Sequence, residues 1–130
     1  MPEPVLVDTD VLIDFARGVP ATASLLAEVA SSSDLGVCCV TEMELIVGCR
    51  NKAELTQLQS FLSGYRRVQL TASIGDQAVE LMTQYRLSHG LLLPDALIAA
   101  TAVVRGCLLL TRNRRHFDYI PGISLLEYRV

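Results

Sequence analysis

The sequence predicts an α/β fold built on a parallel sheet. Short apolar segments alternate along the chain with segments in which apolar residues recur at helical spacing. Hairpin dipeptides such as Asn-Gly do not occur between the short segments, so successive strands are expected to be joined through helices. The composition agrees, because 51% of the residues are apolar but only 5% are aromatic, which suits helices rich in Leu, Val, Ile and Ala packed on a buried sheet. At this length we expect one domain over residues 1–130.

The strands and helices can be placed in order from these patterns. Buried strands are expected at residues 5–7, 36–40, 107–111 and 123–126, with a short edge strand at residues 66–70. Helices are expected at residues 11–17, 21–30, 42–47, 51–64, 73–88 and 95–106, with a polar turn or short helix at residues 112–120. The helix at 95–106 is apolar on nearly every face, which predicts that it is deeply buried.

Several acidic residues stand where they would cap helices. Thr41 is the expected N-cap of the third helix, and Glu44 follows three residues later as in a capping box. Asp8 precedes the first helix, and Asp95 follows Pro94, a residue favoured in a first helical turn. Capping is therefore the structural alternative to a functional role for each of these acids.

Charge is distributed unevenly along the chain. The formal net charge is −3, but residues 1–48 carry eight acids against Arg17 alone, whereas residues 49–130 carry ten basic residues against six acids. A nuclease that holds metal with one region and phosphate with another would show this asymmetry, although a solvated surface is the ordinary alternative. No basic segment precedes an apolar stretch near residue 1, and no apolar run approaches the roughly 18 residues of a membrane span, so we place the protein in the cytoplasm, away from any membrane.

The cysteines do not form a zinc-binding pattern. None of them makes a C-x-x-C pair, and both histidines are distant in sequence; the four are Cys38, Cys39, Cys49 and Cys107. We expect them to be buried, reduced thiols.

Polar residues that follow strands are the candidates for function, because ligands of open parallel sheets bind beyond the carboxyl ends of the strands. Asp8 ends the first strand, Glu44 lies one helical turn past the second, and Asp95 opens its helix. Further polar residues at these strand ends are Thr9, Asp10, Thr111, Arg112 and Asn113. We expect these side chains to meet along one edge of the sheet.

The candidate acids point to a hard cation. Glu44 and Asp95 lie in mostly apolar helices, where an isolated charge is costly. Carboxylates that gather repel one another and raise at least one pKa unless a cation compensates. An all-oxygen ligand set favours Mg²⁺ or Mn²⁺, which would activate water and neutralise charge on a phosphate, so phosphodiester hydrolysis is indicated.

Four ordered motifs resemble those of the PIN-domain ribonucleases. They are V-D-T-D-V-L-I-D at 7–14, T-E-M-E-L-I-V-G at 41–48, L-P-D-A-L-I-A-A-T-A at 93–102 and L-L-T-R-N-R-R-H-F at 109–117, closed by I-P-G-I at 120–123. In order and spacing they most resemble the VapC toxins of prokaryotic VapBC toxin–antitoxin pairs. The resemblance implies a three-layer α/β/α PIN-like domain with a short-stranded, mainly parallel central sheet, which uses Mg²⁺ or Mn²⁺ to cut RNA.

The resemblance assigns roles by motif position. Asp8, Glu44 and Asp95 match the family's metal-binding acids, and Glu42 is set aside because residues two apart do not share a helix face. Many relatives have a further Asp after the late strand, where this chain reads Thr111, Asn113, His116 and Phe117. We expect Asn113 to orient a metal-bound water as part of the catalytic set, and the missing acid leaves open whether one ion or two are bound.

Other residues near these motifs are expected to assist. Thr9, Asp10 and Thr111 would support the site from its rim, and His116 would contact phosphate or have no role. The residues expected to contact RNA phosphates, unless they form only a solvated turn, are Arg112, Arg114 and Arg115.

The resemblance also implies partners. These are a cognate VapB-like antitoxin whose C-terminal tail occupies the active-site groove, a second copy of the chain in a homodimer, and DNA only through the antitoxin.

Two other interpretations stay open. A catalytically weak or dead PIN module that only binds protein or RNA would explain the missing fourth acid. A phosphate-responsive regulatory domain would need a Lys after the late strand, where this chain has Arg112 and Asn113.

Overall fold

The structure is a computed structural model that describes residues 2–128. Within that range five strands form one sheet in the order β3-β2-β1-β4-β5, and every neighbouring pair is parallel. The strands are β1 (Val5–Val7), β2 (Leu35–Cys38), β3 (Arg66–Val68), β4 (Leu108–Leu110) and β5 (Ser124–Leu126). The predicted parallel α/β class is confirmed, and the segment predicted as an edge strand, β3, does lie at an edge.

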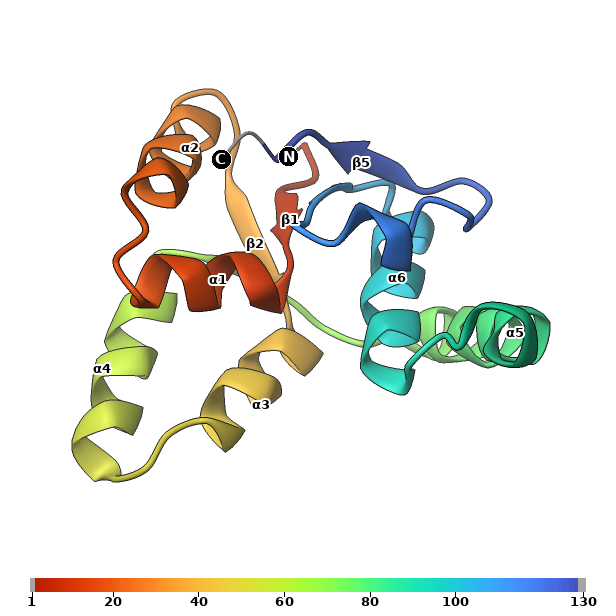
Figure 1. Ribbon diagram of the computed structural model, residues 1–130, viewed down its shortest axis with the longest axis horizontal. Helices are drawn as coiled ribbons and strands as arrows, with labels where there is room; N and C mark the ends of the chain where they lie inside the picture. The colour runs from red at the N-terminus through yellow and green to blue at the C-terminus, as the bar shows by residue number, and fades with distance from the viewer. Residues whose placement is uncertain (1, 129–130) are drawn as a thin grey trace.

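Helices cover both faces of the sheet. They are α1 (Thr9–Ala16), α2 (Pro20–Ala30), α3 (Cys39–Val47), α4 (Lys52–Leu62), α5 (Ala72–His89) and α6 (Leu93–Arg105), followed by a 3₁₀ turn, η1 (Arg114–His116). Figure 1 shows α1, α2 and α4 on one side of the strands and α5 and α6 on the other, which makes the predicted three layers. Helix α3 lies at the end of the sheet where β1 and β2 finish.

The period-two alternation of the strands divides the core into two clusters. Val5 and Val7 pack with α1, α2 and α4, whereas Leu6, between them, packs with α5 and α6. The face towards α6 is closed by an almost continuous buried stretch of that helix, so its predicted deep burial is confirmed. Among the described residues, no helix combines the length and apolar character needed to cross a membrane.

The strand order changes direction at the centre of the sheet. The chain passes from β1 to β2 on one side, and β4 pairs with β1 on the other. Asp8 follows β1 and Thr111 follows β4, and the Asp8 backbone N–H donates to the Leu110 carbonyl at 2.9 Å. Because ligands bind at such a switch point, the fold places these two residues where a functional site is expected.

The capping box predicted at Thr41 is wrong. Helix α3 already begins at Cys39, and its N-cap is Cys38, which makes no side-chain capping bond. Thr41 is fully buried inside the helix, and its hydroxyl lies 3.1 Å from that of Thr9. The strand and helix are both apolar here, so the sequence pattern did not separate them, and Glu44 is free of the capping role.

Candidate active site

Asp8 is held in one orientation by two hydrogen bonds. It is 5% exposed, and one of its oxygens accepts the backbone N–H of Thr9 at 2.8 Å. The other oxygen accepts the hydroxyl of Thr111 at 2.8 Å. Asp8 therefore caps α1, as the structural alternative predicted, but neither bond brings a positive charge to this buried carboxylate.

Asp10 lies beside Asp8, and the two carboxyl groups interact. Burial, with the negative charge of Asp10 as the next cause, raises the pKa of Asp8 to about 7. Burial also raises the pKa of Asp10, against the lowering effects of Arg112 and of a hydrogen bond with Asp8. Asp10 Oδ1 is buried and has no hydrogen-bond partner among the described residues. Asp8 itself has no cation partner among the described residues, and Arg112 does not offset the effect of burial on Asp10, so both carboxylates are costly unless a cation binds beside them.

Glu44 reaches the site through Thr9. The Thr9 hydroxyl donates to Glu44 Oε1 at 2.7 Å, which ties α3 to the start of α1. Glu42, two residues earlier, points elsewhere and forms a bidentate pair with Arg67, at 2.7 and 2.8 Å. The helix thus separates the two acids as their spacing predicted.

Asp95 is in the first turn of α6 but does not cap it. The N-cap is Leu92, which makes no side-chain capping bond. Asp95 Oδ2 lies 3.5 Å from His116 Nδ1. Burial raises the pKa of Asp95, with the charges of Glu44 and Asp10 acting in the same direction and His116 opposing them. The acids of α1, α3 and α6 therefore repel one another at the same edge of the sheet.

Asn113, where the resemblance predicted an acid in many relatives, donates its side-chain N–H to Asp10 Oδ2 at 2.6 Å. Its backbone N–H donates to the Thr111 hydroxyl, which itself donates to Asp8. The segment after β4 is thereby joined to both acids that follow β1. Asn113 supplies no charge, but it holds in place a carboxylate that does.

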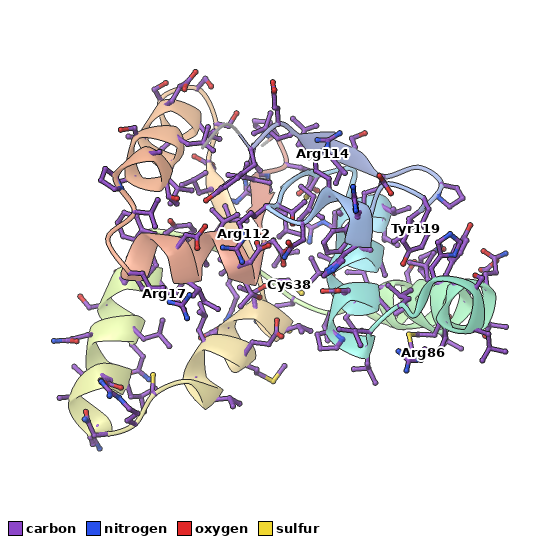
Figure 2. All side chains as sticks on the ribbon, in the orientation of Figure 1. Arg17, Cys38, Arg86, Arg112, Arg114 and Tyr119 are labelled. Atoms are coloured by element: carbon purple, nitrogen blue, oxygen red, sulfur yellow. The ribbon has the colours of Figure 1, made fainter. Side chains whose placement is uncertain are left out.

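The three arginines after β4 are placed differently from one another. Arg112 donates to Asp14 Oδ1 at 2.8 Å, so it is engaged in an ion pair within the fold. Arg114 and Arg115 are exposed on η1. Figure 2 shows Arg112 against α1 and Arg114 on the turn that carries η1. Sequence patterns did not reveal the partner of Arg112, which lies 98 residues earlier.

The donor set suits a cation that keeps part of its own water shell. Within residues 2–128, no three His, Cys, Asp or Glu side chains stand close enough to form a ready-made metal site. The four cysteines are free thiols, of which Cys38 and Cys107 are buried. A hard divalent ion is commonly held by only one or two carboxylates together with waters. Asp8 and Asp95, which interact electrostatically, fit that kind of binding, and the charges of Glu44 and of Asp10, whose Oδ1 has no partner among the described residues, act on the same site.

Comparisons of the sequence show the family of the chain. The family model for the PIN domain matches residues 5–123. Ribonuclease VapC19 of Mycobacterium tuberculosis is 38% identical over 121 residues, which cover 92% of this chain and 96% of that protein. Ribonuclease VapC10 of the same species is 40% identical over 121 residues, which cover 92% of this chain and 90% of that protein.

Solved structures with a similar fold include chains of toxin–antitoxin complexes. A toxin–antitoxin complex from Klebsiella pneumoniae contains a chain that is 31% identical, with a TM-score of 0.77 over 92% of this chain and 95% of that one. VapBC2 from Rickettsia felis, bound to a promoter DNA fragment, has the same fold at 23% identity, with a TM-score of 0.82 over 96% of this chain and 98% of that one. PIN-domain ribonucleases generally depend on a divalent metal. On the family model and these relatives, the chain belongs to the PIN-domain family and, within it, to the VapC ribonucleases.

Proposed function

We propose that this protein is a metal-dependent endoribonuclease that acts as the toxin of a toxin–antitoxin pair. The observation that carries the proposal is the acidic edge of the sheet, where Asp8 is buried, Asp10 and Asp95 are partly buried, and all three have raised pKa values. Such an arrangement is unfavourable for folding alone, because buried carboxylates are normally paired with cations. It is favourable when the site binds a divalent ion.

Asp8 and Asp95 are the proposed ligands of Mg²⁺ or Mn²⁺, with Glu44 as the third acid of the set. When bound, the ion supplies an activated water as nucleophile and neutralises charge that develops on the phosphate. Thr111 keeps the Asp8 carboxylate in one orientation, and Thr9 does the same for Glu44. These hydroxyls act on the ligands and not on the RNA.

The segment after β4 supplies the remaining roles. Asn113 has no charge, but it positions Asp10 through a hydrogen bond. Asp10, whose Oδ1 has no hydrogen-bond partner among the described residues, contributes the negative charge at this end of the site. Arg114 and Arg115 are exposed beside the site and are the proposed phosphate contacts. His116 holds Asp95 from the other side. Arg112 is tied to Asp14, so it acts on phosphate less directly than its neighbours.

Partners follow from the relatives. The relatives are named ribonucleases, and related folds were solved as toxin–antitoxin complexes, some of them with DNA. We propose a VapB-like antitoxin that covers the acidic edge and carries the DNA-binding part, and a homodimer of this chain. We propose that it acts on RNA in the cytoplasm.

The test is an RNA cleavage assay with purified protein and Mn²⁺, with EDTA as the metal-free control. Asp95→Asn is expected to abolish both cleavage and growth inhibition on expression, while its circular dichroism stays that of the wild type. The matched control is Asp76→Asn, an exposed acid on α5 outside the site, which should cleave normally. Full cleavage by Asp95→Asn would remove the central claim.

Asn113 at the fourth position is the one observation that favours a second function, a catalytically weak or dead module that only binds. Titration of Mn²⁺ separates the two functions. Metal-dependent products at any concentration support the enzyme, whereas RNA or antitoxin binding without products at every concentration supports the binding module.

A further inference from the structure

A pocket opens directly beside the acidic edge. It has a volume of about 190 Å³ and lies between the end of α5, the start of α6 and the η1 turn. Its lining includes His89, Leu92, Asp95, Arg115, His116 and Tyr119. Asp95 belongs both to this pocket and to the proposed metal site, so an occupant of the pocket would lie next to the cleavage centre.

One wall of the pocket is a stack of aromatic rings. The rings of His89 and Tyr119 are parallel within 16°, with centroids 4.1 Å apart. Tyr85 meets both rings edge-on, with centroid distances of 5.5 Å to His89 and 5.1 Å to Tyr119. Tyr119 also packs against the core, and Figure 2 shows it beside α5. The stack is therefore fixed by its neighbours, while the His89 end of it is exposed.

The polar groups of the pocket match a nucleotide. Arg115 provides a positive charge at the rim, and Asp95 with His116 forms the side towards the cleavage centre. Proteins recognise single-stranded RNA by stacking unpaired bases on aromatic or histidine rings and by placing cations along the backbone. Flat rings, a cation and a cleavage site thus occur here side by side.

We propose that this pocket holds one unstacked base of a single-stranded RNA, adjacent to the scissile phosphate. The His89–Tyr119 stack is the surface that the base contacts, and Arg115 contacts the adjoining phosphate. These residues would then determine which base is preferred beside the cut. The proposal rests on the endoribonuclease function proposed above and adds a specificity subsite to it.

The test pairs a change in the protein with a change in the RNA. A randomised single-stranded RNA pool first locates the preferred cut, and RNAs with an abasic ribose at each flanking position are then compared. One abasic position should lower kcat/KM of the wild type by about 5- to 150-fold, the equivalent of one lost stacking contact. For His89→Ala, kcat/KM should differ by less than about twofold between the abasic and the intact RNA, because the stacking contact is already gone. His89→Phe, which keeps a flat ring, should restore the sensitivity to the abasic position.

Leu87→Ala is the matched control, since Leu87 is on the same helix, 98% exposed and not part of the pocket lining. It should respond to abasic RNA as the wild type does, and thermal unfolding should show that all variants fold. Equal abasic losses for the wild type and His89→Ala at every position would overturn the subsite. So would a His89→Ala protein that loses only antitoxin binding, because the pocket would then serve a protein side chain.

The same comparison of wild-type and His89→Ala protein, with intact and abasic RNA, is repeated as RNA binding by fluorescence anisotropy in the Asp8→Asn background, where cleavage is expected to be at least about a hundredfold slower. Non-additive losses there support the subsite independently of catalysis. If the wild type cleaves no RNA while the binding cycle stays non-additive, the proposed function fails and the subsite stands. If the protein cleaves RNA but the losses are additive in both measurements, the subsite is refuted and the proposed function stands.

Discussion

Two kinds of buried acid lie within one short stretch of this chain, and their surroundings are opposite. Asp14, 7% exposed, accepts hydrogen bonds from Arg112 at 2.8 Å and from the Tyr128 hydroxyl at 2.8 Å. Asp8, similarly buried, accepts only a backbone N–H and the Thr111 hydroxyl, and the charge that affects its pKa most is that of another acid, Asp10. The fold pairs Asp14 with a cation, whereas Asp8 has no cation partner among the described residues.

The difference shows what each acid contributes. The Tyr128 hydroxyl also lies 2.7 Å from that of Thr22, so Asp14 connects α1, α2 and the segments after β4 and β5. An acid with a cation and a hydroxyl as partners stabilises the fold. A buried acid without a cation partner, as Asp8 is among the described residues, destabilises the fold unless a cation binds there. Substitutions at the two places should therefore have opposite effects.

The largest effect is expected for Asp8→Asn. RNA cleavage should fall by at least about a hundredfold, because metal binding contributes several kcal/mol of transition-state stabilisation. The free energy of unfolding should stay equal or rise, since Asn still caps α1 and the buried negative charge is gone. Single-turnover cleavage with Mn²⁺ and urea unfolding without metal measure the two effects. A marked loss of stability would mean that Asp8 is a structural acid like Asp14.

Asp14→Asn should do the reverse. Loss of a charge-assisted bond to Arg112 should lower the free energy of unfolding by about 2–3 kcal/mol. Cleavage per folded molecule should stay near the wild-type rate, measured well below the unfolding temperature. A hundredfold loss of cleavage in a fully folded Asp14→Asn protein would contradict the division between the two acids.

Asp10→Asn tests whether Asp10 belongs with Asp8 or only supports it. Removing a carboxylate that assists metal ligands is expected to weaken Mn²⁺ affinity by about 10- to 100-fold. Isothermal titration with Mn²⁺ measures this directly, with Glu42→Gln as the control, because Glu42 is paired with Arg67 away from the site. An unchanged affinity would support the rim position that the sequence predicts for Asp10.

The last prediction concerns the pH dependence of stability. Burial raises the pKa of Asp8 to about 7, so the folded protein holds this proton more tightly than the unfolded chain does. Without metal, the free energy of unfolding is therefore greatest where Asp8 is protonated, and this contribution is lost as pH rises from about 4 to about 7. Urea unfolding across this range should show a steeper decline for the wild type than for Asp8→Asn. Equal slopes for the two proteins would show that Asp8 titrates normally.

Local patterns were sufficient to predict most of the fold. The parallel class, the edge position of β3 and the buried α6 follow from apolar spacing, which depends on residues near in sequence. The start of α3 was wrong because strand and helix are both apolar there, and only backbone geometry distinguishes them. The position of Asp8 after a central strand was also predictable, because parallel strands end on one side of the sheet.

The sequence by itself determined the α/β class, the family motifs and the acids Asp8, Glu44 and Asp95 as candidates. The tertiary structure alone decided which polar groups neutralise one another. It paired Asp14 with Arg112, joined Asn113 to Asp10 and stacked Tyr119 on His89 beside Asp95. The reason is physical: hydrophobic periodicity is local, whereas a hydrogen bond or ring contact between distant segments depends on how the whole sheet and its helices pack.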